Sequence, residues 1–244
     1  MLKLWLSFAK FKDVKPKNPT LIVAVSTSLP QYKALYSQAR ELGAYMLEKM
    51  KFEKIATIHS SAFPPEVIVR EGGPSSLPSC HFYIVRGATD LLLFAGDTSP
   101  MEEQYEFAQA LLSYAQALGV KGLYSVGARW TENPLPPEQD PQVMGFATEK
   151  SAVARLKRHG VKISQDEPAP FFASMIVAMA KEYGIKGYKL SVDHGEPSPH
   201  PRSVARMLGI LSALAGFEIP LDDLKARAKT PSLPRNIGDS TIYQ

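Results

Sequence analysis

The apolar run LIVAV at residues 21–25 constrains the fold more than any other stretch of this sequence. Five apolar residues in a row, with no polar residues alternating between them, are typical of a strand buried on both faces of a sheet. A helix is expected from about residue 31 to 50, because apolar residues recur there at spacings of three and four. These residues are Leu35, Ala39, Leu42, Met46 and Met50. A second strand at 52–58 completes a strand-helix-strand unit, which predicts a parallel strand pair with a right-handed crossover.

The alternation of strands and helices continues along the chain. Further strands are expected at 66–70, 80–85, 90–95, 122–127, 143–147 and 185–192. Further helices are expected at 101–118, 149–159, 171–183 and 199–215, with a short one at 221–228. Tyr105 is expected on the inner face of the first of these helices, and Thr148 is expected to cap the second. This order predicts a single α/β domain built on a mixed, mostly parallel sheet flanked by helices.

The composition is that of a globular domain, because 45% of the 244 residues are hydrophobic and 21% are charged. The formal net charge is +4, but five lysines against one aspartate lie in the first twenty residues, so the rest of the chain is nearly neutral. That balance disfavours nucleic-acid binding. The sequence shows neither a membrane span nor a signal-peptide pattern, so a cytoplasmic protein without membrane contact is expected. We expect a core domain at 1–229, with a basic lead at 1–18, and a flexible tail at 230–244.

The loops that follow the strands are the places where an α/β sheet binds small ligands. Asp97 lies after one expected strand, ahead of a helix, where it could hold a hydroxylated ligand or an anion. The alternative, which capping preferences favour, is that Asp97 or Ser99 caps that helix. Arg129 and Glu196 occupy two other strand-end loops. If this protein binds a small ligand, Asp97, Arg129 and Glu196 are the best candidates for its site.

No metal site, cofactor site or catalytic residue set is predicted. The segment from Asp193 to His200 holds four potential metal ligands, but it has no pair of histidines at helical spacing and its prolines make it a stiff loop. The single cysteine, Cys80, precedes His81, and neighbours on a strand point to opposite faces, so they form a poor nucleophile-base pair. The chain contains no phosphate-binding or dinucleotide-binding glycine motif.

The end of the chain combines an apolar residue, a tyrosine and a carboxylate in Ile242, Tyr243 and Gln244. Such a triplet can fill a partner's pocket, stack an aromatic ring at its mouth and pair with a cation. With 10 tyrosines among 244 residues, an ending of this kind arises by chance in roughly two per cent of such chains. A frayed terminus without a partner is the alternative.

Seven blocks of the sequence, taken together and in order, resemble the proteasome-assembly-chaperone-2 family of archaea and many bacteria. They lie at 17–23, 63–72, 90–97, 118–124, 143–148, 181–185 and 195–201, so the resemblance covers most of residues 17–218. The family usually has a glycine-rich turn after its first strand. Here the sequence STSLP at 26–30 replaces that turn, so no contact role of the turn carries over.

The resemblance implies a fold similar to nucleoside phosphorylases and related hydrolases, without an established catalytic residue set, and a tendency to form homo-oligomers. Some members of the family end in a hydrophobic-Tyr-any triplet that docks between α-subunits of the proteasome core particle, where its carboxylate meets a lysine. Ile242, Tyr243 and Gln244 match that triplet position by position. A flexible linker over 230–241 would span roughly 20 Å, enough to reach a neighbouring groove.

Two hypotheses follow from the sequence. The first is a non-enzymatic proteasome assembly chaperone or proteasome-binding factor, whose partners are the α-subunits of the core particle and further copies of itself. The second is a small-ligand-binding protein or enzyme that uses Asp97, Arg129 and Glu196, and fold analogy alone suggests it. A closed polar pocket that joins these three side chains would favour the second hypothesis.

Overall fold

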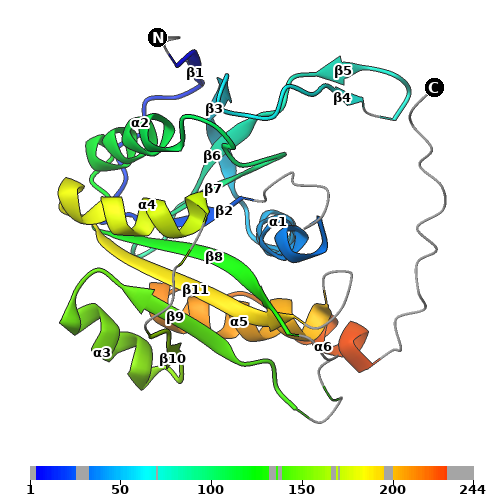
Figure 1. The fold of residues 1–244 in the computed structure, drawn as a ribbon, viewed down its shortest axis with the longest axis vertical. Helices are drawn as coiled ribbons and strands as arrows, with labels where there is room; N and C mark the ends of the chain where they lie inside the picture. Colours follow the sequence, from blue (N-terminus) through cyan, green and yellow to red (C-terminus); the bar gives the residue numbers. More distant parts are fainter. Residues whose placement is uncertain are drawn as a thin grey trace.

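The fold is seen in a computed structural model, which describes residues 4–25, 33–69, 71–131, 136, 139–165, 169, 171–194 and 200–229. A nine-stranded mixed sheet in the order β1-β3-β6-β7-β2-β8-β11-β9-β10 runs through the molecule (Figure 1). The strands are β1 (Leu6–Lys10), β2 (Thr20–Ala24), β3 (Glu53–Ser60), β6 (Cys80–Val85), β7 (Leu91–Gly96), β8 (Gly122–Trp130), β9 (Val143–Ala147), β10 (Lys162–Ile163) and β11 (Lys186–His194). The predicted α/β class, with one mixed sheet flanked by helices, is confirmed.

Helices cover both faces of this sheet (Figure 1). On one face lie α2 (Gln104–Ala117) and α4 (Phe172–Ala180), the latter followed by the short 3-10 helix η2 (Lys181–Tyr183). On the other face lie α1 (Lys33–Lys49), α3 (Lys150–Arg158), α5 (Pro201–Ala215) and α6 (Asp222–Lys229). The sheet is therefore the middle of three layers, with a separate hydrophobic core on each side.

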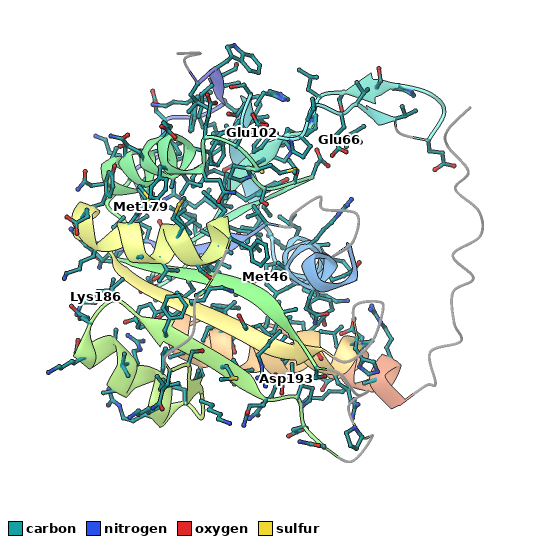
Figure 2. All side chains as sticks on the ribbon, viewed as in Figure 1. Met46, Glu66, Glu102, Met179, Lys186 and Asp193 are labelled. Carbon is teal, nitrogen blue, oxygen red and sulfur yellow. The ribbon has the colours of Figure 1, made fainter. Side chains whose placement is uncertain are left out.

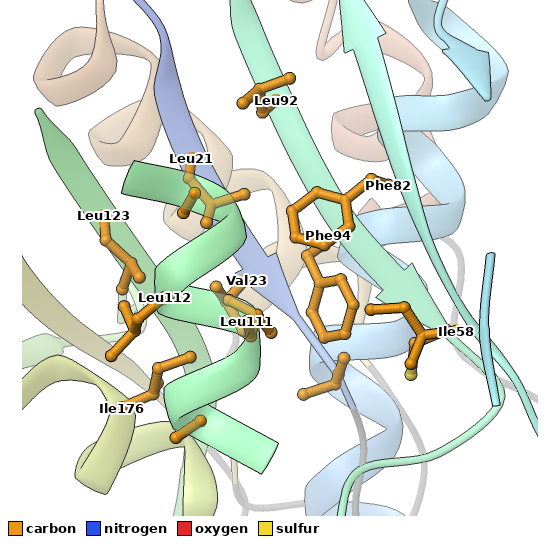
Figure 3. Close-up of a cluster of buried hydrophobic side chains, with 14 of the residues drawn as sticks. Leu21, Val23, Ile58, Phe82, Leu92, Phe94, Leu111, Leu112, Leu123 and Ile176 are labelled. Carbon is orange, nitrogen blue, oxygen red and sulfur yellow. The ribbon is translucent and has the colours of Figure 1, made fainter. Parts of the chain in front are cut away.

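The strand β2 has the double burial that its sequence predicts. Leu21 and Val23 belong to the core under α2 and α4, part of which Figure 3 shows, whereas Ile22 and Ala24 belong to the core under α1 and α5. All four side chains are at most 1% exposed. Full burial of an aliphatic side chain stabilises a fold by about 1.5–3 kcal/mol, so β2 fastens both layers to the sheet.

The first strand-helix-strand unit does not form the expected neighbouring pair. β2 and β3 run in the same direction, but the hairpin of β6 and β7 lies between them, and β7 pairs with β2. Burial explains this order. Every residue of β7 from Leu91 to Ala95 is buried, whereas β3 begins with the exposed residues Glu53 and Lys54. The apolar β7 therefore takes the inner position, and β3 lies nearer the edge.

Several boundaries also differ from the sequence-based expectations. The strand expected at 66–70 is reduced to β4 (Ile68–Val69), which pairs with β5 (Ser75–Ser76) in a separate ribbon rather than in the main sheet. The strands β1 and β10 were not expected, and β8 continues to Trp130, beyond the expected end at residue 127. β4, β5 and β10 have two residues each, which is too short for an apolar pattern, so pairing with neighbours defines them.

Two helix starts also correct the expectations. α2 begins at Gln104, so Glu102 and Glu103 precede it, and Tyr105 is 66% exposed while Phe107 is buried. The expected cap of α3, Thr148, instead accepts a hydrogen bond on Oγ1 from the Gly187 N–H at 3.1 Å. The residue at the N-cap position of α3 is Glu149.

Candidate functional site

Asp97 lies directly after β7, at the edge of the sheet where the parallel strands end. Its Oδ2 accepts hydrogen bonds from the N–H and the hydroxyl of Ser79, at 3.3 and 3.2 Å. The capping role that its sequence position favoured is wrong, because α2 begins seven residues later and Glu103 occupies its N-cap position. The same correction applies to Ser99. The carboxylate of Asp97 therefore joins β7 to the start of β6.

A chain of hydrogen bonds runs from Asp97 to β3. Ser79 Oγ lies 3.3 Å from His81 Nε2, and His81 Nδ1 lies 2.8 Å from Thr57 Oγ1. A carboxylate only accepts hydrogen bonds, so the hydroxyl of Ser79 donates to Asp97 and its oxygen accepts from His81 Nε2–H. Nδ1 is then the acceptor for the hydroxyl of Thr57. In this tautomer, His81 donates to Ser79 and cannot take its proton, so the pair is not a nucleophile with its base.

Sequence reasoning missed this chain of polar residues. Ser79 directly precedes β6 and His81 lies two residues further on, within that strand. In extended chain this spacing puts both side chains on one face, and it is the one signal that the sequence carried. Cys80 lies between them and points to the opposite face, as expected, where its Sγ donates to the Thr98 carbonyl at 3.1 Å. Burial raises the pKa of the Cys80 thiol, which opposes formation of a reactive thiolate.

Arg129 lies near the end of β8 and pairs with Asp193 on the neighbouring β11. Arg129 donates from Nε to Asp193 Oδ1 at 2.8 Å, and its Nη2 also lies 2.8 Å from that oxygen. The Asp193 residue is 7% exposed, and its backbone carbonyl accepts from Ser203 Oγ at 2.9 Å. The charge of Arg129 therefore balances a largely buried carboxylate and ties β8 to β11; Figure 2 shows Asp193 at the end of its strand.

The structure places Asp97 directly after β7 and Arg129 on β8, and β2 lies between these two strands. Their described partners lie in opposite directions, Ser79 on the β6 side and Asp193 on the β11 side. The hydrogen bonds and the ion pair described above do not join the two side chains. Glu196 lies outside the described residues, as do residues 26–30. A joint ligand site of Asp97, Arg129 and Glu196 therefore stays a prediction.

Lys189 is the unexpected polar residue of the central sheet. It lies in the middle of β11, on the face that α4 covers, and is 7% exposed. Its Nζ donates to the Leu190 carbonyl at 3.1 Å and to Ser191 Oγ at 3.2 Å, and among the described contacts no carboxylate reaches it. Burial lowers the pKa of this amine to about 7.

Two residues of the neighbouring β8 adapt to this lysine. Gly127 makes room for the amine, because a Cβ at that position would lie 2.8 Å from Lys189 Nζ. Ser125 stands opposite Lys189, and its buried hydroxyl has no hydrogen-bond partner among the described residues. The sequence contained no sign of this burial, since a lysine that alternates with apolar residues on a strand normally faces water.

The described residues contain no group of three or more histidine, cysteine, aspartate or glutamate side chains that could hold a metal ion. Within the same residues, the helices are too short or too polar to cross a membrane. The predicted partner-binding residues Ile242, Tyr243 and Gln244 lie outside the described part of the chain, which ends at Lys229.

The sequence profile of the PAC2 family matches residues 39–231, more than three quarters of the chain. The chain belongs to the PAC2 family. This confirms the resemblance seen in the sequence. An uncharacterised protein of Methanocaldococcus jannaschii is 23% identical over 223 residues, which cover 90% of this chain and 83% of that protein.

Solved structures show the same fold. PbaB of Pyrococcus furiosus, described as an archaeal proteasome activator, superposes with a TM-score of 0.79 at 18% identity, over 92% of this chain and 94% of PbaB. PbaA of the same organism, an archaeal homologue of proteasome-assembly chaperone, gives 0.70 at 18% identity, over 93% and 92% of the two chains. A proteasome-assembly chaperone homologue of Mycobacterium tuberculosis gives 0.72 at 18% identity, over 86% and 90%.

Proposed function

We propose that this PAC2-family chain is a non-enzymatic factor that binds the proteasome core particle in the cytoplasm, as an assembly chaperone or activator-like protein. The observation that carries the proposal is the shared fold, since this chain matches an archaeal proteasome activator over 92% of its length. The polar residues at the strand ends are consistent with a binding role. Asp97 bonds to Ser79 and Arg129 bonds to Asp193 within the fold, so these described contacts are structural ones.

The proposed contact with the core particle is the triplet Ile242, Tyr243 and Gln244. With Gln244 as the last residue, the isoleucine enters an apolar pocket between two α-subunits, the tyrosine ring stacks at its mouth and the terminal carboxylate pairs with a lysine. The helix α6 ends at Lys229, so residues 230–241 form the linker. A flexible linker of this length spans roughly 20 Å.

Homo-oligomerisation belongs to the same proposal, because one triplet offers a small contact area and binds weakly. Several triplets on one symmetric assembly raise the effective concentration of each tail once the first has bound. Overall affinity then depends on the number of tails as well as on each contact. An oligomer should therefore bind the core particle more tightly than a monomer with the same tail.

A pull-down with purified proteasome core particle tests the role of the tail. Deletion of residues 242–244 should abolish most of the binding, and Tyr243→Ala should lose most of the affinity because the buried aromatic ring anchors the contact. Thr241→Ala is the matched control, since it lies beside the triplet and should bind like the wild type. Two further residues appended after Gln244 should also prevent binding, because they displace the carboxylate.

The outcomes separate the two levels of the proposal. Equal binding with and without residues 242–244 would remove the tail from the contact while leaving the partner in place. Absence of binding by the full-length chain, at concentrations where it is oligomeric, would contradict the proteasome role itself.

A further inference from the structure

The strand β1 lies at one edge of the nine-stranded sheet, and β3 is its partner on the inner side (Figure 1). No described strand pairs with its outer side. The hydrogen bonds flanking β1 show which groups face that side. The Ser61 N–H donates to the Trp5 carbonyl at 3.0 Å, and the Phe11 N–H donates to the Ile55 carbonyl at 2.9 Å. Trp5 and Phe11 therefore turn their backbone groups inward.

Backbone direction alternates along an antiparallel strand, so Ser7 and Ala9 also turn their N–H and C=O groups towards β3. The residues between them, Leu6, Phe8 and Lys10, turn theirs towards the outer edge. This edge thus presents three N–H and three C=O groups in a row. An unpaired row of this kind is a template for a further strand.

The side chains of this segment divide between two faces. Leu6 and Phe8 pack into the core under α2, where the Phe8 and Tyr114 ring centroids are 4.5 Å apart. The residues with odd numbers lie on the opposite face and are all exposed: Trp5, Ser7, Ala9 and Phe11. Trp5 is 52% exposed and Phe11 is 57% exposed. Two large exposed aromatic side chains at the two ends of one edge strand indicate a contact surface.

These two aromatic residues are placed symmetrically, each three positions from Phe8. We propose that β1 pairs antiparallel with β1 of a second copy of this chain, about a two-fold axis at Phe8, so that Trp5 of each copy packs against Phe11 of the other. The two sheets then form one continuous sheet across the dimer.

The backbone supports this register. Pairing about Phe8 sets Phe8 opposite Phe8 and Leu6 opposite Lys10, so all the outward N–H and C=O groups of both copies find partners. A shift of one residue would set outward groups against inward ones and lose these bonds. Moving the two-fold axis from Phe8 to Ser7 or Ala9 would keep some of the hydrogen bonds. It would, however, separate Trp5 of one copy from Phe11 of the other. The aromatic pair therefore selects the register centred on Phe8.

The side chains support a second copy as the occupant. Ser7 and Ala9 face each other across the axis, and both are small enough for the close spacing of a non-hydrogen-bonded pair. Trp5 and Phe11 occupy the next such pair, where aromatic side chains interact well. Lys10 of one copy faces Leu6 of the other, and Lys12 faces Leu4 in the same way. No like charges therefore stand directly opposite each other across the contact. An isologous two-fold contact requires this self-complementarity.

The pairing rests on the homo-oligomerisation that the proposed function includes, but it does not depend on proteasome binding. It names the surface through which two copies meet, whether or not the assembly binds a proteasome. A chain that dimerises through β1 but does not bind the core particle would contradict only the proteasome role. A chain that binds the core particle and dimerises through another surface would contradict only the pairing.

The affinity of the contact is tested by Lys10→Pro in the full chain, measured by sedimentation equilibrium. Proline lacks the backbone N–H that Lys10 turns outward. That N–H does not bond to β3, so the substitution leaves the hydrogen bonds between β1 and β3 in place. The dissociation constant of the dimer should rise about tenfold or more, because two hydrogen bonds per dimer are lost. Lys10→Ala is the matched control, since it removes the same exposed side chain but keeps the N–H, and it should change the constant by less than about threefold.

The register is tested independently with cysteine variants. A Ser7→Cys chain mixed with an Ala9→Cys chain should give a disulfide-linked heterodimer under mild oxidation, because paired Cα atoms at such positions are about 4.5 Å apart. Either variant alone should give much less, since its two cysteines are about 7–8 Å apart on the diagonal. The native Cys80 is buried and does not compete.

Three results would overturn the pairing. The first is equal dimer affinity of Lys10→Pro and Lys10→Ala, with circular dichroism showing that both are folded. The second is equal cross-linking of the mixture and of the single variants. The third is a wild-type chain that remains monomeric at every concentration tested.

Discussion

Replacement of Lys189 by methionine should stabilise this protein at neutral and acidic pH. Methionine has a similar length and no charge, so it fills the same space between β8 and α4 without the cost of burying an ammonium group. The lysine has a pKa of about 7 in the folded chain, against 10.5 for the free side chain. That difference corresponds to about 5 kcal/mol of lost stability when the buried amine is charged.

The hydrogen bonds of the amine offset part of this cost. Nζ donates to the Leu190 carbonyl and to Ser191 Oγ, and two such bonds contribute about 2 kcal/mol together. The Lys189→Met chain should therefore be more stable than the wild type by about 3 kcal/mol at pH 6. Urea unfolding followed by circular dichroism measures this difference.

The sign of the pH dependence follows from proton binding. Between pH 7 and 10.5 the unfolded chain keeps the Lys189 amine protonated while the folded chain releases the proton, so the unfolded state binds more protons. The stability of the wild type therefore rises with pH across this window, by about 1.4 kcal/mol per pH unit from this group. The advantage of Lys189→Met should be constant below pH 7 and should approach zero near pH 9.

A matched control is Lys186→Met on the same strand. Lys186 is exposed and pairs with Glu149 at 2.8 Å, and that hydrogen bond raises the pKa of its amine. Its profile between pH 6 and 9 should run parallel to that of the wild type. The reasoning is refuted if Lys189→Met is no more stable than the wild type at pH 6, or if its advantage does not shrink between pH 7 and 9.

Two further substitutions test the packing and the acid stability. Gly145→Ala should destabilise the fold by about 1–3 kcal/mol, because its Cβ would lie 2.3 Å from the Lys189 carbonyl oxygen. Gly209→Ala in α5 should instead stabilise the fold by up to about 1 kcal/mol, because its Cβ would lie 3.9 Å from Leu221 Cδ1, an ordinary van der Waals contact. Thermal unfolding compares the two variants. Burial alone would raise the pKa of Asp90, but hydrogen bonds from the Lys17 and Gly87 N–H groups and from Arg86 lower it overall. Asp90 therefore stabilises the fold above pH 3.8, the ordinary pKa of an aspartate, and loses that effect as the pH falls through its lowered pKa. The Asp90→Asn variant should therefore show a weaker loss of stability at acid pH than the wild type. An equal loss of stability in both chains would exclude this role.

Local patterns in the sequence were sufficient where one element alone decides the outcome. The buried strand expected at 21–25 is β2 at 20–24, and the apolar positions Ala39, Leu42 and Met46 of α1 are buried as their periodicity predicted. The pattern was insufficient where elements compete for one position. The apolar β7 takes the place beside β2 that the order along the chain assigned to β3, because the strand that gains more by double burial occupies the inner position.

The candidate polar residues show the same division. Asp97 and Arg129 were recognised from their positions after strands, but their partners Ser79 and Asp193 lie 18 and 64 residues away in the sequence. No local rule selects such partners, because strand order and register bring them together. The burial of Lys189 has the same origin, since it depends on α4 covering that face of β11.

The sequence by itself determined the family of this chain, the alternation of strands and helices, and the double burial of its central strand. These properties follow from residue type and spacing, which act within a few turns or residues. Only the tertiary structure decided the strand order, the depth of Lys189, the partners of Asp97 and Arg129, and the outward row of backbone groups on β1. Each of these depends on contacts between distant segments, and the free energy of such contacts exists only after the chain has folded.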